Sequence, residues 1–147
     1  MSKWTCTKHH QAGMSLVELM IVVVIIAVLA GIGYPSYQSF MRESKRSDAH
    51  AILSKLASDQ ERFSSNARTY TDDLTDLGYD DADSASSPEG YWTATVDSAG
   101  AATFSLSATV AAPHSDDDCN QLILTGLGEK RSRPKGSVSF NPPGTCW

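Results

Sequence analysis

The chain has 147 residues, a formal net charge of −5, an isoelectric point of about 5.2 and a hydrophobic content of 41%. This length suits one ordinary domain with some additional elements and excludes two full domains. The composition excludes a disordered polyelectrolyte and a multi-span membrane protein, and the net acidity argues against nucleic acid as the default partner. The average conceals a long apolar block near the N-terminus.

The apolar block extends from Leu19 to Met41 without a charged residue. With a rise of ~1.5 Å per residue, a helix of this length can cross a hydrocarbon core that is ~30 Å thick. Lipid favours the helix over a lone strand because the helix satisfies its backbone hydrogen bonds internally. Basic residues lie on both sides of the block, so charge bias gives little information about its orientation.

Three interpretations fit this block. The first is a secretory signal peptide with a small-residue cleavage site at Val28-Leu29-Ala30, but Glu18 stands at the edge of the block and apolar residues continue past Ala30. The second is a plain membrane anchor for a soluble domain. The third depends on Gly13, which ends a short basic leader, so that the apolar block follows the expected cleavage point.

The residues after Gly13 read Met14-Ser15-Leu16-Val17-Glu18, followed by the long apolar stretch. This pattern resembles the processing signal of type IV prepilins, in which Phe-Thr-Leu-Ile-Glu usually follows the glycine. Met14 and Ser15 depart from that sequence, and the next three residues fit it. The resemblance implies that a prepilin peptidase cuts between Gly13 and Met14 and methylates the new Met14 amine.

The resemblance also implies roles for Glu18 and Pro35. In the family, the Glu18 carboxylate would pair with the Met14 amine of a neighbouring subunit during assembly. Opposite charges about 4 Å apart attract by roughly 4 kcal/mol at an effective dielectric constant of 20, which would favour one axial register of the helices. The alternative for Glu18 is a charge at headgroup level with no special partner. Pro35 lies where many pilins carry a proline that bends the helix.

Beyond Pro35, apolar residues recur at spacings of three and four, which is typical of an amphipathic helix. We therefore predict one long helix from about Leu16 to Ser65, with its first half in lipid or a fibre core and its second half against a soluble domain. The apolar stripe comprises Ala49, Ile52, Leu53, Leu56, Gln60 and Phe63. The opposite face comprises Ser47, Asp48, His50, Lys55, Asp59 and Arg62.

Turn and strand signals fill the rest of the chain. We expect a short helical turn capped by Thr71 and ended by Gly78, and then an acidic, serine-rich loop at 80–89. Strands are predicted at 91–96, 102–110 and 121–125, with a short fourth piece at 137–140. In the second of these strands, Phe104, Leu106 and Ala108 share one face.

This order predicts an α+β fold in which a long N-terminal helix packs on a small antiparallel sheet of three to four strands, as in the type IV pilin fold. The expected division is a leader at 1–13, a transmembrane and polymerisation half-helix at 14–41, and a head domain at 42–147.

Removal of the leader takes away Cys6 and leaves Cys119 and Cys146. Two cysteines in an exported domain predict a disulfide, and two free thiols are the alternative. In the family this bridge frames a surface loop involved in subunit contacts or recognition. The strand pattern and the terminal Cys146-Trp147 resemble the minor-pilin branch called PilE.

Several weaker signals remain. His9-His10 could suggest a metal site but lies in the leader, and residues 115–118 fit a solvated loop better than a calcium site. The basic cluster Lys130, Arg131, Arg133 and Lys135 is either a solvated turn or a contact for an anionic polymer such as DNA. The sequence contains no catalytic set or phosphate loop, so we expect neither an enzyme nor a cofactor or metal.

The sequence therefore predicts a structural subunit, a minor one, of a type IV pilus that supports pilus biogenesis, twitching motility and adhesion. The implied partners are other pilin subunits, prepilin peptidase and the inner-membrane assembly machinery. The precursor would span the bacterial inner membrane with its head outside the cytoplasm, and the mature subunit would enter an extracellular fibre.

Two alternatives stay open. One is a type II secretion pseudopilin, a class that often has a calcium loop and commonly lacks this cysteine pair. The other is an anchored or secreted binding module that does not polymerise.

Overall fold

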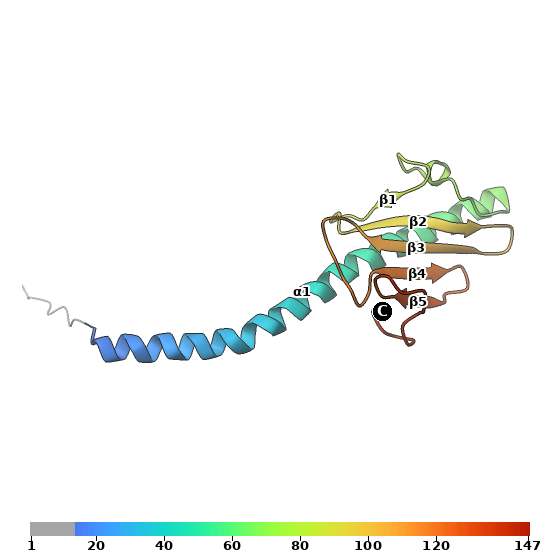
Figure 1. Ribbon diagram of the computed structural model, residues 1–147. Coiled ribbons are helices and arrows are strands. Elements are labelled where there is room, and N and C mark those ends of the chain that lie inside the picture. The colour runs from blue at the N-terminus through green and yellow to red at the C-terminus, as the bar shows by residue number, and fades with distance from the viewer. Residues whose placement is uncertain (1–13) are drawn as a thin grey trace, which may run out of the picture. The chain divides into compact units, whose positions relative to one another are not determined.

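The computed structural model describes residues 14–147. The chain divides into two compact units, residues 1–39 and 40–147. Helix α1, Leu16–Ala67, extends from the first unit into the second and is drawn from blue to green in Figure 1. The prediction of one long helix is confirmed, with an end two residues beyond the expected Ser65.

The first unit consists of the apolar half of α1. All the side chains described from Met14 to Ser39 are exposed. Among residues 14–147, α1 is the one helix that is long and apolar enough to cross a membrane, judged by its length and composition.

The second unit contains an antiparallel sheet of five strands in chain order (Figure 1). The strands are β1 at Ala85–Ser86, β2 at Trp92–Ala99, β3 at Phe104–Val110, β4 at Gln121–Thr125 and β5 at Lys130–Arg133. Between Val96 and Ser98 the pairing of β2 with β3 shifts register. The α+β fold class is confirmed, and the sheet has one strand more than the upper end of the prediction.

The predicted strand at 137–140 is wrong, and the fourth long strand is β5 instead. Pro134 and a left-handed Gly136 (φ 71°) separate residues 137–140 from β5, and this chemistry favours a turn. The sequence of β5 carries three cations in four residues and has no apolar strand signal. It forms a strand because its backbone pairs with β4 from Gln121↔Arg133 to Leu124↔Lys130.

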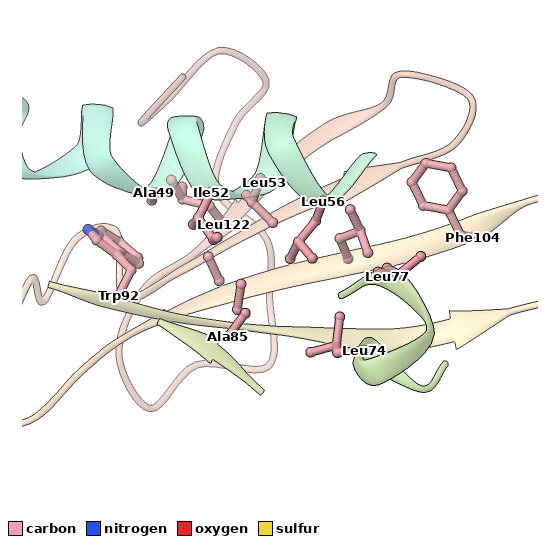
Figure 2. Close-up of a cluster of buried hydrophobic side chains, with 13 residues drawn as sticks. Ala49, Ile52, Leu53, Leu56, Leu74, Leu77, Ala85, Trp92, Phe104 and Leu122 are labelled. Atoms are coloured by element: carbon pink, nitrogen blue, oxygen red, sulfur yellow. The ribbon is translucent and has the colours of Figure 1, made fainter. Parts of the chain in front are cut away.

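The hydrophobic core lies between the second half of α1 and one face of the sheet. In Figure 2, Ala49, Ile52, Leu53 and Leu56 point from the helix toward the strands and the connection that precedes them. Burial of such apolar surface stabilises the fold by about 25 cal/mol per Å². The sheet and the connection contribute Leu74, Leu77, Ala85, Trp92, Ala94, Phe104, Leu106, Ala108 and Leu122.

The connection between α1 and the sheet contains a short 3-10 helix, η1, at Leu74–Leu77. The predicted cap Thr71 is wrong, since the side chain of Asp73 accepts a hydrogen bond from the Thr75 backbone N–H. Gly78 ends the turn as expected, in a left-handed conformation (φ 93°) that favours glycine. Thr71 instead binds α1, because the buried Gln60 amide donates to its carbonyl and accepts from its N–H.

Candidate functional site

The N-terminal turn of α1 carries Glu18, its only charged residue before Arg42. Gly13 and the rest of the leader, including His9 and His10, lie outside the described residues. Met14 lies two residues before the start of α1 at Leu16, is 68% exposed, and stands four positions before Glu18, which is about one helical turn. An acidic side chain in the first turn also interacts favourably with the partial positive charge of the helix N-terminus.

Helix α1 continues through Pro35, the residue at which we predicted a bend. Gly31 and Gly33 precede it in the first unit, and a Cβ atom added at either glycine would meet nothing within 4 Å. Packing within the described chain therefore does not require glycine at these positions, although two glycines and a proline lower the helix propensity of the segment.

The disulfide predicted between Cys119 and Cys146 is confirmed. It joins Cys119, two residues before the start of β4, to a C-terminal segment that runs beside the outer strand β5. Two hydrogen bonds tie this segment to β5: the Asn141 N–H donates to the Ser132 carbonyl at 2.8 Å, and the Ser132 hydroxyl donates to the Thr145 carbonyl at 2.9 Å. The bridge thus holds a strap, residues 141–147, along the free edge of the sheet.

The strap ends on α1 at His50. The rings of His50 and Trp147 stack with centroids 4.7 Å apart and an interplanar angle of 7°. His50 Nε2 lies 3.0 Å from the Cys146 carbonyl oxygen and donates to it, since a carbonyl can only accept. The indole N–H of Trp147 donates to the Arg131 carbonyl at 2.9 Å, so the last residue connects the helix to β5.

The acidic stretch 115–118 is held by basic partners. Asp116 is buried and binds Arg46 through two hydrogen bonds, of 2.7 Å to Nε and 3.0 Å to Nη2, and it also accepts from the Cys119 N–H. The hydrogen bond to Asp116 raises the pKa of Arg46 above its usual value. Asp117 lies 3.7 Å from Lys135. Among residues 14–147, no group of three His, Cys, Asp or Glu side chains is arranged to hold a metal ion.

The four predicted residues of the basic cluster do not share one surface. Arg131 and Arg133 alternate with the buried Ser132, so they lie on the face of β5 away from α1, and both guanidinium groups lie over the Phe140 ring. Lys130 lies over the Trp147 ring, 5.1 Å from its centroid. The expected turn is wrong for Lys130, Arg131 and Arg133, which belong to β5, although Lys130 and Arg131 are exposed.

Sequence reasoning missed two buried carboxylates on the helix face that we expected to be polar and exposed. Asp48 accepts hydrogen bonds from the Ser87 hydroxyl and the Glu89 N–H. Asp59 accepts from the Tyr79 hydroxyl at 3.0 Å, and Lys55 donates to the same hydroxyl at 2.8 Å. Both sites fasten the connection before β2 to the helix, and helical periodicity alone carries no signal for them.

The comparisons with known proteins agree with this arrangement. The family model described as "Type IV minor pilin ComP, DNA uptake sequence receptor" matches residues 35–123, which is more than half of the chain. The chain belongs to the type IV minor pilins. A second model, the prokaryotic N-terminal methylation motif, matches residues 8–34 of this pilin. Such a motif implies a prepilin peptidase and pilus machinery. Pilins are structural proteins, and family membership therefore confirms that this pilin is not an enzyme.

Individual relatives are also pilins. The type IV major fimbrial protein FimA of Dichelobacter nodosus is 30% identical over 120 residues, which cover 80% of this pilin and 72% of FimA. The type IV major pilin protein PilA of Myxococcus xanthus is 40% identical over 67 residues, covering 46% of this pilin and 30% of PilA. The fimbrial protein of Moraxella nonliquefaciens is 34% identical over 64 residues, covering 44% of this pilin and 42% of that protein. The last two matches thus span less than half the length of those relatives.

Proposed function

We propose that this chain is cut after Gly13, methylated at the Met14 amine and polymerised as a minor subunit of a type IV pilus. Residues 14–41 would form part of the fibre core, and residues 42–147 would form the head. Pilus biogenesis, twitching motility and adhesion are the activities that such a subunit would support.

The observation that carries the proposal is the unpartnered apolar half of α1. Its large apolar side chains, from Leu16 to Ile32, are all exposed in the single chain. A soluble monomer rarely exposes a contiguous apolar patch larger than a few hundred Å². The segment therefore needs another environment: first the inner membrane, which it spans once with the head outside the cytoplasm, and then the helices of neighbouring subunits in the fibre.

In this proposal Glu18 sets the register of the packed helices. Apolar helices pack without strong axial preference, whereas a carboxylate and an amine must meet to avoid an unpaired charge in an apolar core. The Met14 amine of a neighbouring subunit would supply the positive charge. A type II secretion pseudopilin would use the same contact, but the confirmed terminal disulfide and the match to a minor-pilin family favour the pilus.

We predict that Glu18→Ala leaves cleavage and methylation intact but lowers the amount of this subunit in sheared fibres by roughly tenfold or more, because about 1.4 kcal/mol of lost pairing already corresponds to tenfold. N-terminal mass spectrometry of membrane-extracted protein checks the first part, and quantitative proteomics of sheared fibres checks the second. Glu43→Ala is the control, since it removes an exposed carboxylate from the head part of the same helix. Normal incorporation of the Glu18 variant, or a mature chain that does not start at Met14, would contradict the proposal.

DNA binding at β5 is a second candidate function. The matched family model is described as a DNA uptake sequence receptor, and in this chain Arg131 and Arg133 present guanidinium groups on one face beside the exposed ring of Phe140. Arginines contact phosphates, and arginine or aromatic planes can stack on bases. Glu129 pairs with Arg131 at 2.8 Å, so part of this positive charge is already neutralised within the head.

If the β5 face binds DNA, Arg131→Ala combined with Arg133→Ala should weaken binding and lower the salt slope of log K by roughly 0.9 for each DNA phosphate that the protein no longer neutralises. Fluorescence anisotropy of a labelled duplex, titrated with the mature chain in nanodiscs at several salt concentrations, measures both quantities. Arg62→Ala is a matched control because it removes an exposed arginine from α1. An unchanged slope in the double variant would exclude β5 as the binding face.

A further inference from the structure

Tyr34 and Tyr37 are exposed aromatic residues at the end of the apolar half of α1. Their side chains are 67% and 62% exposed, and no aromatic residue lies between Met14 and Gly33. Residues three apart on a helix are neighbours on its surface, so the two rings share one side of α1. The Gln38 amide donates to the Tyr34 hydroxyl at 3.1 Å, which adds a polar group beside the first ring.

A tyrosine ring combines an apolar body with a polar hydroxyl, and membrane proteins concentrate such rings at the boundary between hydrocarbon and headgroups. We propose that Tyr34 and Tyr37 bind the headgroup layer of the phospholipid bilayer and thereby fix the depth of α1 before the subunit enters a fibre. This inference rests on the membrane stage of the proposed function.

The spacing along α1 matches one bilayer. At ~1.5 Å per residue, Glu18 and Tyr34 are separated by about 24 Å of helix, and Glu18 and Tyr37 by about 28 Å, compared with a hydrocarbon core of ~30 Å. When the tyrosine rings lie in one headgroup layer, the Glu18 carboxylate reaches the opposite one and stays hydrated. A displacement of one helical turn toward the head would draw this carboxylate into hydrocarbon, which is costly.

The surrounding sequence agrees with a headgroup contact on the head side of the span. Residues 34–41 carry no charge, and the first charged residue after Tyr37 is the cation Arg42. A basic residue just outside a membrane span is attracted to the negative charge of lipid phosphates. Along the chain, the apolar residues before Gly33 are followed by the two tyrosines among Ser36, Gln38 and Ser39, then by Phe40 and Met41, and then by Arg42. Polarity therefore rises from Tyr34 onward, as it does on leaving a bilayer, although two apolar side chains precede the first cation.

The test measures the depth of single probes in the mature chain, residues 14–147, reconstituted at a low protein-to-lipid ratio in phosphatidylethanolamine and phosphatidylglycerol vesicles. Cys119 and Cys146 are joined in the disulfide and do not react with a thiol-specific label. Bimane is therefore attached to one introduced cysteine, at Ser36→Cys in one variant and at Val23→Cys in the other. Nitroxide lipids labelled at the headgroup or at mid-chain quench the probe according to depth. We expect headgroup quenching to exceed mid-chain quenching at Ser36 by at least twofold, and the reverse at Val23.

The double variant Tyr34→Leu/Tyr37→Leu keeps apolar bulk and removes the hydroxyls, so the segment should sink. The ratio of headgroup to mid-chain quenching at Ser36 should then fall at least twofold. The control Ile25→Leu/Ile26→Leu changes apolar side chains within the span and should leave the ratio unchanged.

Three results would overturn the inference. One is a Ser36 probe at mid-chain depth in the unmodified chain, and another is a depth that Tyr34→Leu/Tyr37→Leu does not alter. The third is a probe shielded from both lipids whose signal depends on the protein-to-lipid ratio, because the tyrosines would then contact a second copy.

If the Val23 probe also fails to reach mid-chain depth, the span itself is absent and the membrane stage of the proposed function fails too. A normal Val23 result confines the failure to the tyrosines.

Discussion

His50 is the point where the last residues of the chain meet the helix, and its charge state bears on that contact. Burial lowers the pKa of His50, the nearby cations Lys130 and Arg46 lower it further, and the hydrogen bond to the Cys146 carbonyl opposes both effects. The neutral ring stacked on Trp147 is therefore the form that the folded state favours.

This lowered pKa predicts how stability depends on pH. Below the ordinary histidine pKa of about 6.5, the unfolded chain binds a proton that folded His50 resists, so the free energy of unfolding should fall as the pH drops from about 7 through this window. The fall attributable to His50 should level off once the folded histidine is also protonated. Urea denaturation at a series of pH values measures the slope.

His50→Gln provides the control, because glutamine can still donate to the Cys146 carbonyl but does not titrate. The variant should show a shallower dependence between about pH 5 and 7, whereas carboxylates, with ordinary pKa values near 4, contribute mainly at lower pH. An identical slope in the two proteins would exclude His50 as the titrating group.

At the scale of elements, the sequence predicted those with a strong local pattern. The apolar periodicity of α1 placed Ile52, Leu53 and Leu56 correctly on the buried face, and alternation placed Phe104 and Leu106 correctly in β3. Local pattern predicts these elements because the same residues set both the secondary structure and the burial.

The elements that the sequence did not predict depend on contacts between distant residues. Strand β5 forms through backbone pairing with β4, despite its charged side chains. Asp48 and Asp59 are buried because residues 79–89 fold over them and supply donors, although the helical pattern put both on the outer face. The same distinction applies to the candidate sites. The processing site after Gly13 was predicted because it is a local sequence motif. The placement of the basic cluster on two faces of β5 was not predicted, because it depends on strand register.

The strap, residues 141–147, gives a prediction at this scale. The bridge between Cys119 and Cys146 closes a loop with a sequence separation of 27 residues. Replacing both cysteines by serine should lower the free energy of unfolding by roughly 3.5 kcal/mol, according to the chain-entropy account of disulfides. Urea denaturation of the mature chain in detergent measures this loss.

A local effect should accompany the global one. Without the bridge, the strap keeps only its hydrogen bonds and the His50–Trp147 stack, so Ser132 and its neighbours in β5 should exchange amide hydrogens faster than residues in β3. Ser115→Ala is the control, since it changes an exposed hydroxyl in the same loop region. Equal stability of the double serine variant and this control would rule out a stabilising role for the bridge.

At the scale of the whole molecule, the two halves of α1 have different roles. Every buried apolar residue of the core cluster falls between Ala49 and Leu122, inside the second unit, while the first unit contributes none to it. The membrane and assembly requirements therefore act on a segment that the head does not need for its own core. A subunit of this kind can lie in lipid and later in a fibre without refolding its head.

This separation predicts that residues 42–147 alone form a soluble, monomeric, cooperatively folding domain, whereas the chain from Met14 requires detergent. Size-exclusion chromatography with light scattering and urea denaturation check both properties.

The matched comparison is a shorter fragment, residues 47–147, which lacks Arg46 and Lys45. It leaves the buried Asp116 carboxylate without its cation and the Trp92 indole N–H without the Lys45 carbonyl, 2.8 Å away in the structure. Because the Asp116 carboxylate is buried while Arg46 is only partly buried, loss of this partner should make the shorter fragment less stable by roughly 1–3 kcal/mol. An insoluble 42–147 fragment would contradict the prediction that the head folds without the apolar half of α1. Equal stability of the two fragments would contradict the stabilising role of the contacts made by Lys45 and Arg46.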